Sequence, residues 1–519
     1  MVDHFRDETE APVPWPSTLP GLIGHWAGLQ PTLPALLAEN GDTLTFQELA
    51  SAIGQISADL RALGVRTEDR VVMFTPHAAR TAVTLLGLAS TCAAVPLSPD
   101  TTKEEFRSLL MRLSPAAVLV PWSEREGWAA TVASVAGIGL LLHEPVPGAP
   151  FRGRISGKPV GSPVVEQPVT AEDIAFVTCT SGTTGRAKLV PTTHLAVTFS
   201  QRVPLFGDCA GRRSLLVKPL SLAAGQMTLR RCLGSGTTMV IPDRFGATRM
   251  VDLILEHQPV FLQLTPHLLG DLCAAWQSRL PGQTAAAHGL RAVSSGSAML
   301  PATTRQLAQD VLGVPVLGIY GATEASGIAS STIEDVAPSW SVGRPRRPVR
   351  IMAEGLAVAA GEVGEIEVSG EGLTPGYIDD AELTAAAFTA DGWYRTGDLG
   401  FLRDGFLGVL GRSDEVINVA GLKVDPVEVE RAVGDLPGIR DVAAFAVPSD
   451  HSGSRVALAV VSHADAPLDR RALRRHLLGV LTKHKVPTLI IEVDEIPRTA
   501  LGKVQRNVLA QRAQDSGNG

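Results

Sequence analysis

The chain has 519 residues, more than one hydrophobic core usually serves, so we expect two or more domains. A formal net charge of −7 leaves no basic footprint and argues against nucleic acid as a partner. No stretch is apolar over the length of a membrane span and the acidic N-terminus has no signal-peptide pattern, so we expect a cytoplasmic protein of unknown oligomeric state.

The first part of the chain alternates between strand-like and helical patterns. Apolar strand-like runs occur at residues 71–74 and 238–241, and helical patterns occur at residues 46–63 and 103–113. This alternation predicts layered α/β structure as far as about residue 317.

A loop rich in small hydroxyl residues follows an apolar strand predicted at residues 174–177. The loop consists of Thr180, Ser181, Gly182, Thr183, Thr184, Gly185, Arg186, Ala187 and Lys188. Glycines let backbone N–H groups approach an anion, and hydroxyls and a lysine add donors, so the loop suits a polyphosphate. It is not a Walker A loop, because Leu189 follows the lysine where Ser or Thr would hold Mg²⁺. Taken alone, a flexible polar loop without a ligand is an equal alternative.

The cysteines show no metal-ligand spacing, and we expect free thiols in a reducing compartment. They are Cys92, Cys179, Cys209, Cys232 and Cys273. Cys179 adjoins the hydroxyl-rich loop, where a small buried apolar residue is favoured over a redox role.

Later segments add three more candidate motifs. Tyr320-Gly321-Ala322-Thr323-Glu324 follows an apolar run and reads locally as a strand, a turn and a helix N-cap at Thr323. Short strands and turns at residues 350–410 predict a small β subdomain, which contains Tyr394-Arg395-Thr396-Gly397-Asp398. An α+β module follows from residue 411, and Pro497-Arg498-Thr499-Ala500-Leu501-Gly502-Lys503 lies near its end.

In this order, the four motifs resemble those of the adenylate-forming enzymes, which include acyl- and aryl-CoA ligases, stand-alone adenylation domains and beetle luciferases. The resemblance extends from about residue 43 to residue 506 and is nearest to the acyl-CoA ligases. It implies an α/β fold with a large N-terminal domain of layered sheets plus a small β subdomain, residues 1–411. It also implies a smaller mobile α+β domain, residues 412–519, with a hinge near Asp414.

The resemblance implies ATP, Mg²⁺ and CoA as reactants and cofactors, and it assigns roles to the motifs. The hydroxyl-rich loop with Lys188 would hold the ATP phosphates, although Ala187 and Leu189 depart from the family's proline and glycine. Lys503 would be catalytic, bridging the acid and the α-phosphate, where the alternative is a surface lysine. Glu324 would bind Mg²⁺. The remaining nucleotide contacts would come from Gly296, Ser297, Ala298, Tyr320, Gly321, Ala322, Thr323, Asp398 and Arg412, with Thr323 at the α-phosphate and Asp398 at the ribose.

The acid pocket departs from the family pattern. Leu222 stands where CoA ligases commonly have a histidine, and no aspartate is present nearby for an α-amine. A free amino acid is therefore disfavoured, because its ammonium would be buried unpaired. The pocket residues expected from the resemblance are Leu222, Ala223, Ala224, Gly225, Gly296, Gly318, Gly321 and Gly327, which predict a bulky and apolar acid unless other residues fill the space.

The thiol acceptor stays open between two alternatives. Gly421 matches the position that lets a pantetheine arm pass in relatives that load CoA and in those that load a carrier protein. The leading prediction is an AMP-forming acid–thiol ligase using CoA. The alternatives are an adenylation enzyme that hands its acyl-AMP to a carrier protein or a second enzyme, and a non-catalytic acyl-nucleotide binding protein.

Overall fold

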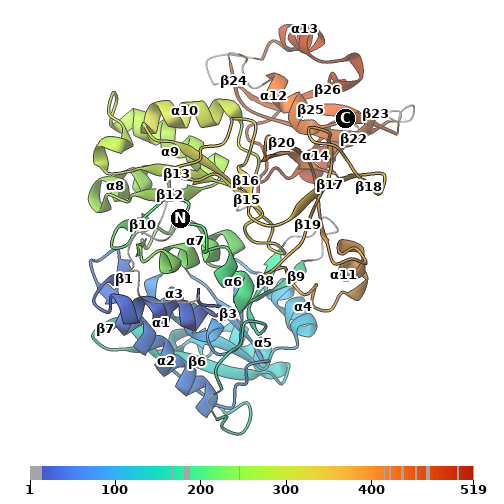
Figure 1. Ribbon diagram of the computed structural model, residues 1–519. Coiled ribbons are helices and arrows are strands. Elements are labelled where there is room, and N and C mark those ends of the chain that lie inside the picture. Colours follow the sequence, from blue (N-terminus) through green and yellow to red (C-terminus); the bar gives the residue numbers. More distant parts are fainter. Residues whose placement is uncertain are drawn as a thin grey trace. The chain divides into compact units, whose positions relative to one another are not determined.

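The computed structural model describes residues 15–76, 78–165, 167–180, 187–244, 246–413, 415–419, 422–433, 436, 438–449, 453–462, 468–499 and 502–517. The chain divides into two compact units (Figure 1). Unit 1 comprises Met1–Pro204, Asp208–Asp243 and Glu371–Ala381, and unit 2 comprises Leu205–Gly207, Arg244–Gly370 and Glu382–Gly519. The predicted division at residue 411 is a different one and stays a prediction, and Asp414 lies outside the described residues.

Unit 1 is built on a sheet with the strand order β7-β6-β5-β3-β4-β8-β9. Its central strands pair in parallel, and β7 and β9 are antiparallel to their neighbours. The strands are β3 (Arg70–Phe74), β4 (Ala93–Leu97), β5 (Ala117–Pro121), β6 (Gly139–Val146), β7 (Ala149–Gly157), β8 (Ile174–Thr180) and β9 (Lys188–Thr193).

Further strands of unit 1 lie in the order β10-β11-β1-β2. They are β1 (Pro34–Ala38), β2 (Thr43–Thr45), β10 (Arg213–Leu215) and β11 (Thr238–Ile241). The helices are α1 (Leu19–Leu29), α2 (Phe46–Ala62), α3 (Ala79–Ala89), α4 (Lys103–Leu113), α5 (Trp128–Val135), α6 (His194–Phe199) and α7 (Ala223–Gly234).

Local signals set where α2 and α4 begin. Thr45 accepts from the backbone N–H of Glu48 while the Glu48 carboxylate accepts from the Thr45 N–H, and Thr102 and Glu105 repeat this capping box. The apolar face of α4 packs into the core, where Phe106 is fully buried and lies against Phe74 of β3. The two predicted helices are therefore confirmed almost to the residue.

Unit 2 begins with parallel strands β12 (Phe261–Leu264), β13 (Ala292–Ser295) and β14 (Val316–Tyr320), followed by short antiparallel β15 (Ala329–Ser330) and β16 (Arg344–Pro345). Its helices here are α8 (Ala247–His257), α9 (Pro266–Arg279) and α10 (Ala302–Leu312). An antiparallel sheet in the order β18-β17-β19-β20-β21 confirms the predicted β subdomain. It contains β17 (Val349–Ala353), β18 (Leu356–Ala357), β19 (Gly364–Val368), β20 (Tyr394–Arg403) and β21 (Phe406–Arg412), with α11 (Ala381–Ala387) before β20.

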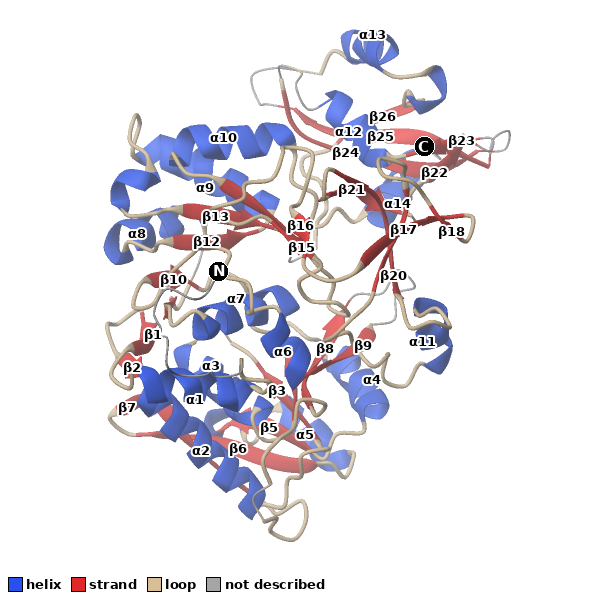
Figure 2. Cartoon of the chain, in the orientation of Figure 1, coloured by secondary structure: helices blue, strands red, loops and turns tan. Residues whose placement is uncertain are grey.

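The last part of unit 2 is the predicted α+β module (Figure 2). Its sheet runs β23-β22-β25-β24, and β26 pairs with β25 in parallel. The elements are β22 (Ile417–Val419), β23 (Leu422–Val424), α12 (Pro426–Val433), β24 (Ile439–Ser449), β25 (Gly453–Ser462), α13 (Arg470–Val480), β26 (Leu489–Glu492) and α14 (Arg506–Gly517). Two apolar layers cover this sheet, one centred on Leu458 and the other on Phe445.

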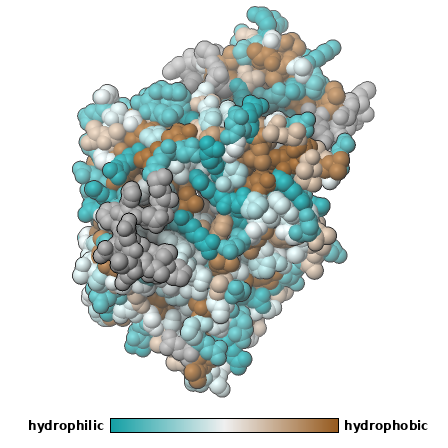
Figure 3. Space-filling view, viewed as in Figure 1, coloured by the Kyte–Doolittle hydropathy of each residue, from teal (hydrophilic) through white to brown (hydrophobic). Residues whose placement is uncertain are grey.

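The surface is mixed in polarity. Hydrophilic residues and smaller hydrophobic areas alternate on the face in Figure 3. Within the described ranges, no helix combines the length and the apolar character that crossing a membrane requires.

Candidate functional site

The hydroxyl-rich loop joins two strands of unit 1. β8 ends at Thr180, β9 begins at Lys188, and these two residues pair across the antiparallel ladder. Arg112 of α4 donates to the backbone oxygen of Ala187 at 2.6 Å, and Lys188 Nζ lies 5.3 Å from the ring centroid of Tyr377. Both ends of the loop are thus held firmly, while Ser181, Gly182, Thr183, Thr184 and Gly185 lie outside the described residues.

Helix α7 presents one face to β8. Gln226 lies 3.5 Å from the Thr178 hydroxyl, and one turn later the Arg230 guanidinium lies 5.6 Å from the ring centroid of Phe176. One helical turn advances about as far as two strand residues, so the two elements run in opposite directions along each other. Arg230 lies beside Phe176 and Gln226 beside Thr178, so Ala223, about one turn before Gln226, should lie beside the end of β8. The predicted acid segment therefore begins beside the end of β8, where Thr180 is the first residue of the predicted phosphate loop.

The glycines assigned to the acid pocket have a structural reason of their own. A Cβ on Gly225 would lie 2.0 Å from the Pro219 oxygen, one on Gly318 would lie 2.7 Å from the Val342 oxygen, and one on Gly296 would lie 2.8 Å from the Ile319 oxygen. These glycines allow backbone segments to approach, and backbone fills the space beside them. Leu222, Ala223 and Ala224 at the start of α7 are partly exposed, and the assignment of these residues and of the glycines to an acid pocket stays a prediction.

In unit 2, two predicted nucleotide segments follow neighbouring strands. β13 ends at Ser295 before Gly296, Ser297 and Ala298, β14 ends at Tyr320, and the two strands are parallel, so both segments leave the same edge of the sheet. Ser297 adopts a left-handed backbone (φ 71°), which is uncommon for a residue with a side chain.

The segment after Tyr320 is a tight turn. Ala322 and Ala325 exchange backbone hydrogen bonds of 3.2 Å, and the Ile328 N–H returns to the Tyr320 oxygen. Gly321 sits at the base, where a Cβ would lie 3.1 Å from the backbone nitrogen of Gly327. Thr323 is partly exposed and Glu324 is buried, and no helix begins in the described residues 321–328. The helix N-cap alternative for Thr323 is therefore wrong, whereas the strand and the turn are confirmed.

Two motifs that are distant in sequence meet at Tyr320. Its hydroxyl donates to the Asp398 carboxylate at 2.5 Å, and Arg412 lies opposite Asp398 in the β20–β21 ladder with a nitrogen 3.6 Å from the other carboxylate oxygen. Burial, and then the Asp398 charge, raise the pKa of Tyr320 well above its ordinary value, so the phenol stays protonated and holds this bond. Gly397 has φ 70°, a backbone conformation that residues with a side chain rarely adopt, so glycine suits this position beside Arg412.

The loop that carries Lys503 is a closed turn in unit 2. The Thr499 N–H donates to the Lys503 oxygen and the Gly502 N–H to the Thr499 oxygen, both at 2.8 Å, with Gly502 at φ 78°. The Lys503 side chain is exposed. The turn therefore presents an ammonium group on a fixed backbone.

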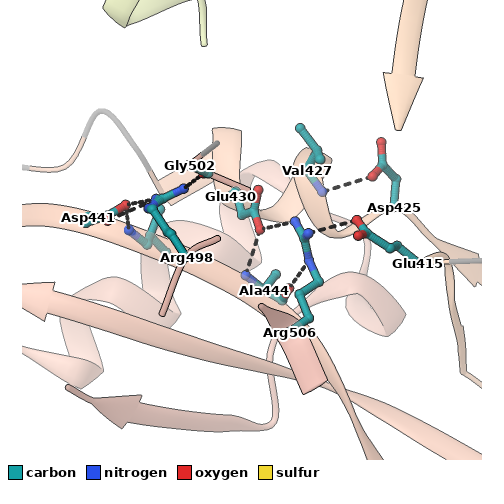
Figure 4. A network of polar contacts seen from close by, with 10 residues as sticks. Glu415, Asp425, Val427, Glu430, Asp441, Ala444, Arg498, Gly502 and Arg506 are labelled. Carbon is teal, nitrogen blue, oxygen red and sulfur yellow. Dashed lines mark hydrogen bonds and ion pairs between the residues drawn. The ribbon is translucent and has the colours of Figure 1, made fainter. Parts of the chain in front are cut away.

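Two arginines anchor this turn on either side (Figure 4). Arg498 forms a two-pronged ion pair with Asp441 at 2.8 and 3.0 Å and donates to the Gly502 oxygen. Arg506 binds Glu415 at 2.8 Å and Glu430 at 2.7 Å. We call Glu415, Glu430, Asp441, Arg498 and Arg506 the C-terminal network.

Cys179 packs against the core of unit 1, and burial raises its thiol pKa to about 12. Such a thiol is scarcely ionised at neutral pH, which supports the role of a small apolar residue over a redox role. All five cysteines are free, as predicted. Gly421 lies outside the described residues, so its assignment to the thiol channel stays a prediction.

Reading the sequence missed three basic residues near the acid segment: Lys218, Arg230 and Arg231. All three are buried in unit 1, with exposed fractions of 7%, 3% and 7%. The available signal was the charge itself, because Arg230 and Arg231 are the only charged residues of α7, whose other residues are apolar or neutral.

Comparisons with known proteins cover nearly the whole chain. The family model for AMP-binding enzymes matches residues 23–378, and the model for the AMP-binding enzyme C-terminal domain matches residues 428–503. The sulfoacetate–CoA ligase of Cupriavidus necator is 30% identical over 512 residues, which cover 96% of this chain and 98% of that protein. The indoleacetate–CoA ligase of Aromatoleum aromaticum is 30% identical, with coverages of 94% and 97%. The crystal structure of ATP-bound MatB from Rhodopseudomonas palustris superposes with a TM-score of 0.85 at 26% identity, covering 96% and 99% of the two chains.

Proposed function

The chain belongs to the AMP-binding enzymes as an AMP-forming acid–thiol ligase, and from this we propose that it activates a bulky, largely apolar carboxylic acid and joins it to CoA. In the first half-reaction the carboxylate oxygen attacks the α-phosphorus of ATP, forming acyl-AMP and releasing pyrophosphate. In the second, the CoA sulfur attacks the acyl carbon, giving acyl-CoA and AMP, and the thiol proton passes to solvent.

The observation that carries the proposal is the hydrogen bond between Tyr320 and Asp398. Two family motifs 78 residues apart meet in it, with Arg412 beside them. Asp398 keeps acceptor capacity for ribose hydroxyls, and the fixed Tyr320 ring offers a face on which adenine can stack. Gly296, Ser297, Ala298, Gly321 and Ala322 would complete this nucleotide contact.

The charges of the reaction need cations. An anionic carboxylate must approach an anionic triphosphate, so donors placed where charge develops lower the barrier. We assign this role to Lys503 at the α-phosphate and to Lys188 with the loop from Thr180 to Gly185 at the leaving pyrophosphate.

Glu324 fits a magnesium ligand, since Mg²⁺ in nucleotide sites takes one or two carboxylates together with phosphate oxygens, and Thr323 adds a hydroxyl beside it. The bound ion would supply charge neutralisation. Glu324→Gln should therefore raise the Mg²⁺ concentration needed for half-maximal activity.

The acid class follows from the start of α7. Leu222, Ala223 and Ala224 are aliphatic and partly exposed beside the end of β8, and apolar surface buried there stabilises the bound acid by about 25 cal/mol per Å². Relatives named for acids as different as sulfoacetate and indoleacetate show that this family accepts wide variation in the acid.

An acid panel assayed with ATP, Mg²⁺ and CoA tests the proposal. We expect CoA thioester and AMP from bulky apolar acids and little from acetate or free amino acids. Ala224→Trp should shift the preference toward smaller acids, whereas the control Ala386→Trp, on exposed α11, should not. Acyl-AMP without free CoA thioester would favour a carrier protein or a second enzyme as acceptor, and absence of pyrophosphate exchange with every acid would favour a non-catalytic binding protein.

A further inference from the structure

The segment that begins with helix α13 carries a concentrated positive charge. Residues 470–491 contain four arginines and two lysines but neither aspartate nor glutamate. The whole chain carries −7, so subtracting the six positive charges of this segment leaves −13 for the remaining residues. The charge of the chain is therefore distributed unevenly, and this segment is opposite in sign to the rest.

Helix α13 packs on the sheet of the α+β module (Figure 2). Leu473 and Leu477 are buried in the apolar layer centred on Leu458. A ring nitrogen of His476 lies 3.0 Å from the Ala432 oxygen at the end of α12. These contacts fix which side of α13 faces the module and which side faces solvent.

The solvent side combines cations with an apolar residue. Arg471, Arg474 and Arg475 precede Leu478 by seven, four and three residues, and this spacing places all four side chains on one helix face. The three arginines are exposed, and so is Leu478, with an exposed fraction of 53%. We call these four residues the basic face of α13.

The positions of the arginines are unfavourable for the helix itself. Arg470 and Arg474, like Arg471 and Arg475, are equal charges four residues apart, and the two arginines of the first turn oppose the helix dipole. Asp469 caps the helix by accepting two backbone N–H groups at 2.9 and 3.0 Å. None of the four arginines forms an ion pair with another residue that the structure describes. An anionic partner outside the chain would reduce this repulsion.

We propose that the basic face of α13 docks on a membrane surface that contains anionic lipids. Groups of about four to eight basic residues on an amphipathic helix are typical of such binding. Leu478 lies among the arginines, so it can enter the boundary between headgroups and acyl chains while the guanidinium groups meet lipid phosphates. Because the remainder of the chain is acidic, the same surface repels it, and α13 is the side that turns toward the membrane.

A lipid surface suits this face better than an acidic protein does. Lipids rearrange around side chains that project from a convex helix, whereas a protein must present carboxylates in a matching pattern. The proposal concerns peripheral binding and does not depend on the ligase reaction.

Sedimentation of the full chain with lipid vesicles tests the proposal. One set of vesicles contains phosphatidylcholine and phosphatidylserine, and the other contains phosphatidylcholine alone. The wild type should bind only the first set at about 0.15 M salt, and about 1 M salt should release it, because the screening length falls from about 8 to about 3 Å.

The combined variant Arg471→Gln, Arg474→Gln and Arg475→Gln should bind the anionic vesicles about a hundredfold more weakly, since each cation near such a surface contributes about fivefold. A matched control changes the net charge equally by replacing three exposed arginines elsewhere with glutamine, and it should bind as the wild type does. These control arginines are Arg212, Arg213 and Arg291.

Two more variants separate a lipid from a protein partner. Replacing Arg471, Arg474 and Arg475 with lysine should retain most of the vesicle binding, because a lipid surface responds to charge, whereas two-pronged arginine–carboxylate pairing would be lost. Leu478→Ala should weaken binding to the anionic vesicles several-fold. All these substitutions are at exposed positions, so the Tm of each variant should match that of the wild type.

Three results would overturn the proposal: no binding to phosphatidylserine vesicles at about 0.15 M salt, equal binding by the wild type and the glutamine variant, or loss of binding in the lysine variant. Binding to poly-L-glutamate without binding to vesicles would assign the face to an acidic protein instead. None of these measurements uses ATP or an acid, so each outcome leaves the proposed ligase function standing.

Discussion

Two groups of buried or half-buried basic residues differ in their surroundings. One is the C-terminal network, and the other, which we call the α7 cation cluster, consists of Lys218, Arg230 and Arg231 in unit 1. In the C-terminal network, Arg498 and Arg506 each meet carboxylates at 3.0 Å or less. In the α7 cation cluster, Lys218 and Arg230 meet an arginine and a phenylalanine face.

This difference separates two uses of buried charge. Burial raises the pKa of Glu430, although the charge of Arg506 acts in the opposite direction. Each of the two buried charges therefore depends on the other, and the pair holds the segment that follows Lys503. Among the described residues, no carboxylate pairs with Lys218 or Arg230 in this way, and Arg230 Nε and Nη1 have no hydrogen-bond acceptor. A buried charge with an internal partner can help to maintain structure, whereas a buried charge without one lowers the stability of the fold.

The largest effect on activity should come from Lys503, the cation that the C-terminal network presents to solvent. Lys503→Ala should lower adenylation, measured by pyrophosphate exchange, by about two to three orders of magnitude, since loss of one charge-stabilising donor costs about 3–4 kcal/mol. Thioester formation from supplied acyl-AMP should survive. Lys483→Ala, at another exposed lysine, serves as the control. Equal losses in both half-reactions would contradict a role confined to adenylation.

Removing one basic residue from each group tests the comparison directly. Arg506→Met should lower the free energy of unfolding by about 3–5 kcal/mol, because Glu430 stays buried without its partner. Glu430→Gln in the same chain should recover part of the loss. Lys218→Met should be neutral or stabilising, because it removes a buried charge that has no carboxylate partner among the described residues. Denaturant unfolding measures all three, and a large loss in Lys218→Met would show that its charge is compensated within the fold.

The cluster should also reveal itself in alkaline solution. Burial lowers the pKa of Lys218 from 10.5 to about 8. Between these two pH values the native state binds fewer protons than the unfolded state. The free energy of unfolding should therefore increase as the pH rises through this window. The gain should be roughly 1–3 kcal/mol across that window. Lys218→Met should lack it, so the difference between the wild-type and variant unfolding curves should depend on pH between 8 and 10.5. Parallel curves would contradict the lowered pKa.

The smallest effect should come from Tyr320, whose hydroxyl binds Asp398, the carboxylate that we assign to the ribose. Tyr320→Phe removes the hydrogen bond to Asp398, which should weaken ATP binding by about 1–2 kcal/mol while leaving the KM for the acid nearly unchanged. Asp398→Asn should also weaken ATP binding selectively, and by more than Tyr320→Phe does, because ribose contacts are lost as well. Equal weakening of ATP and acid binding would argue against the nucleotide assignment.

Local sequence patterns determined much of the fold. The patterns at residues 46–63 and 103–113 correspond to α2 and α4, and the run at 238–241 is β11. These signals act over three or four residues, as the capping box between Thr45 and Glu48 illustrates, so they can be read without knowing the rest of the chain. The motif order likewise indicated the family, which the whole-chain matches confirm.

Only the tertiary structure decided which distant residues become partners. The hydrogen bond from Tyr320 to Asp398 joins two sheets of unit 2, and backbone lies so close to Gly225 and Gly318 that packing alone gives a reason for glycine there. The burial of Lys218 and Arg230, with no carboxylate paired to either among the described residues, could not be read from the sequence. The free-energy cost of burying a charge depends on the groups that surround it in space, and the order of residues along the chain does not specify those groups.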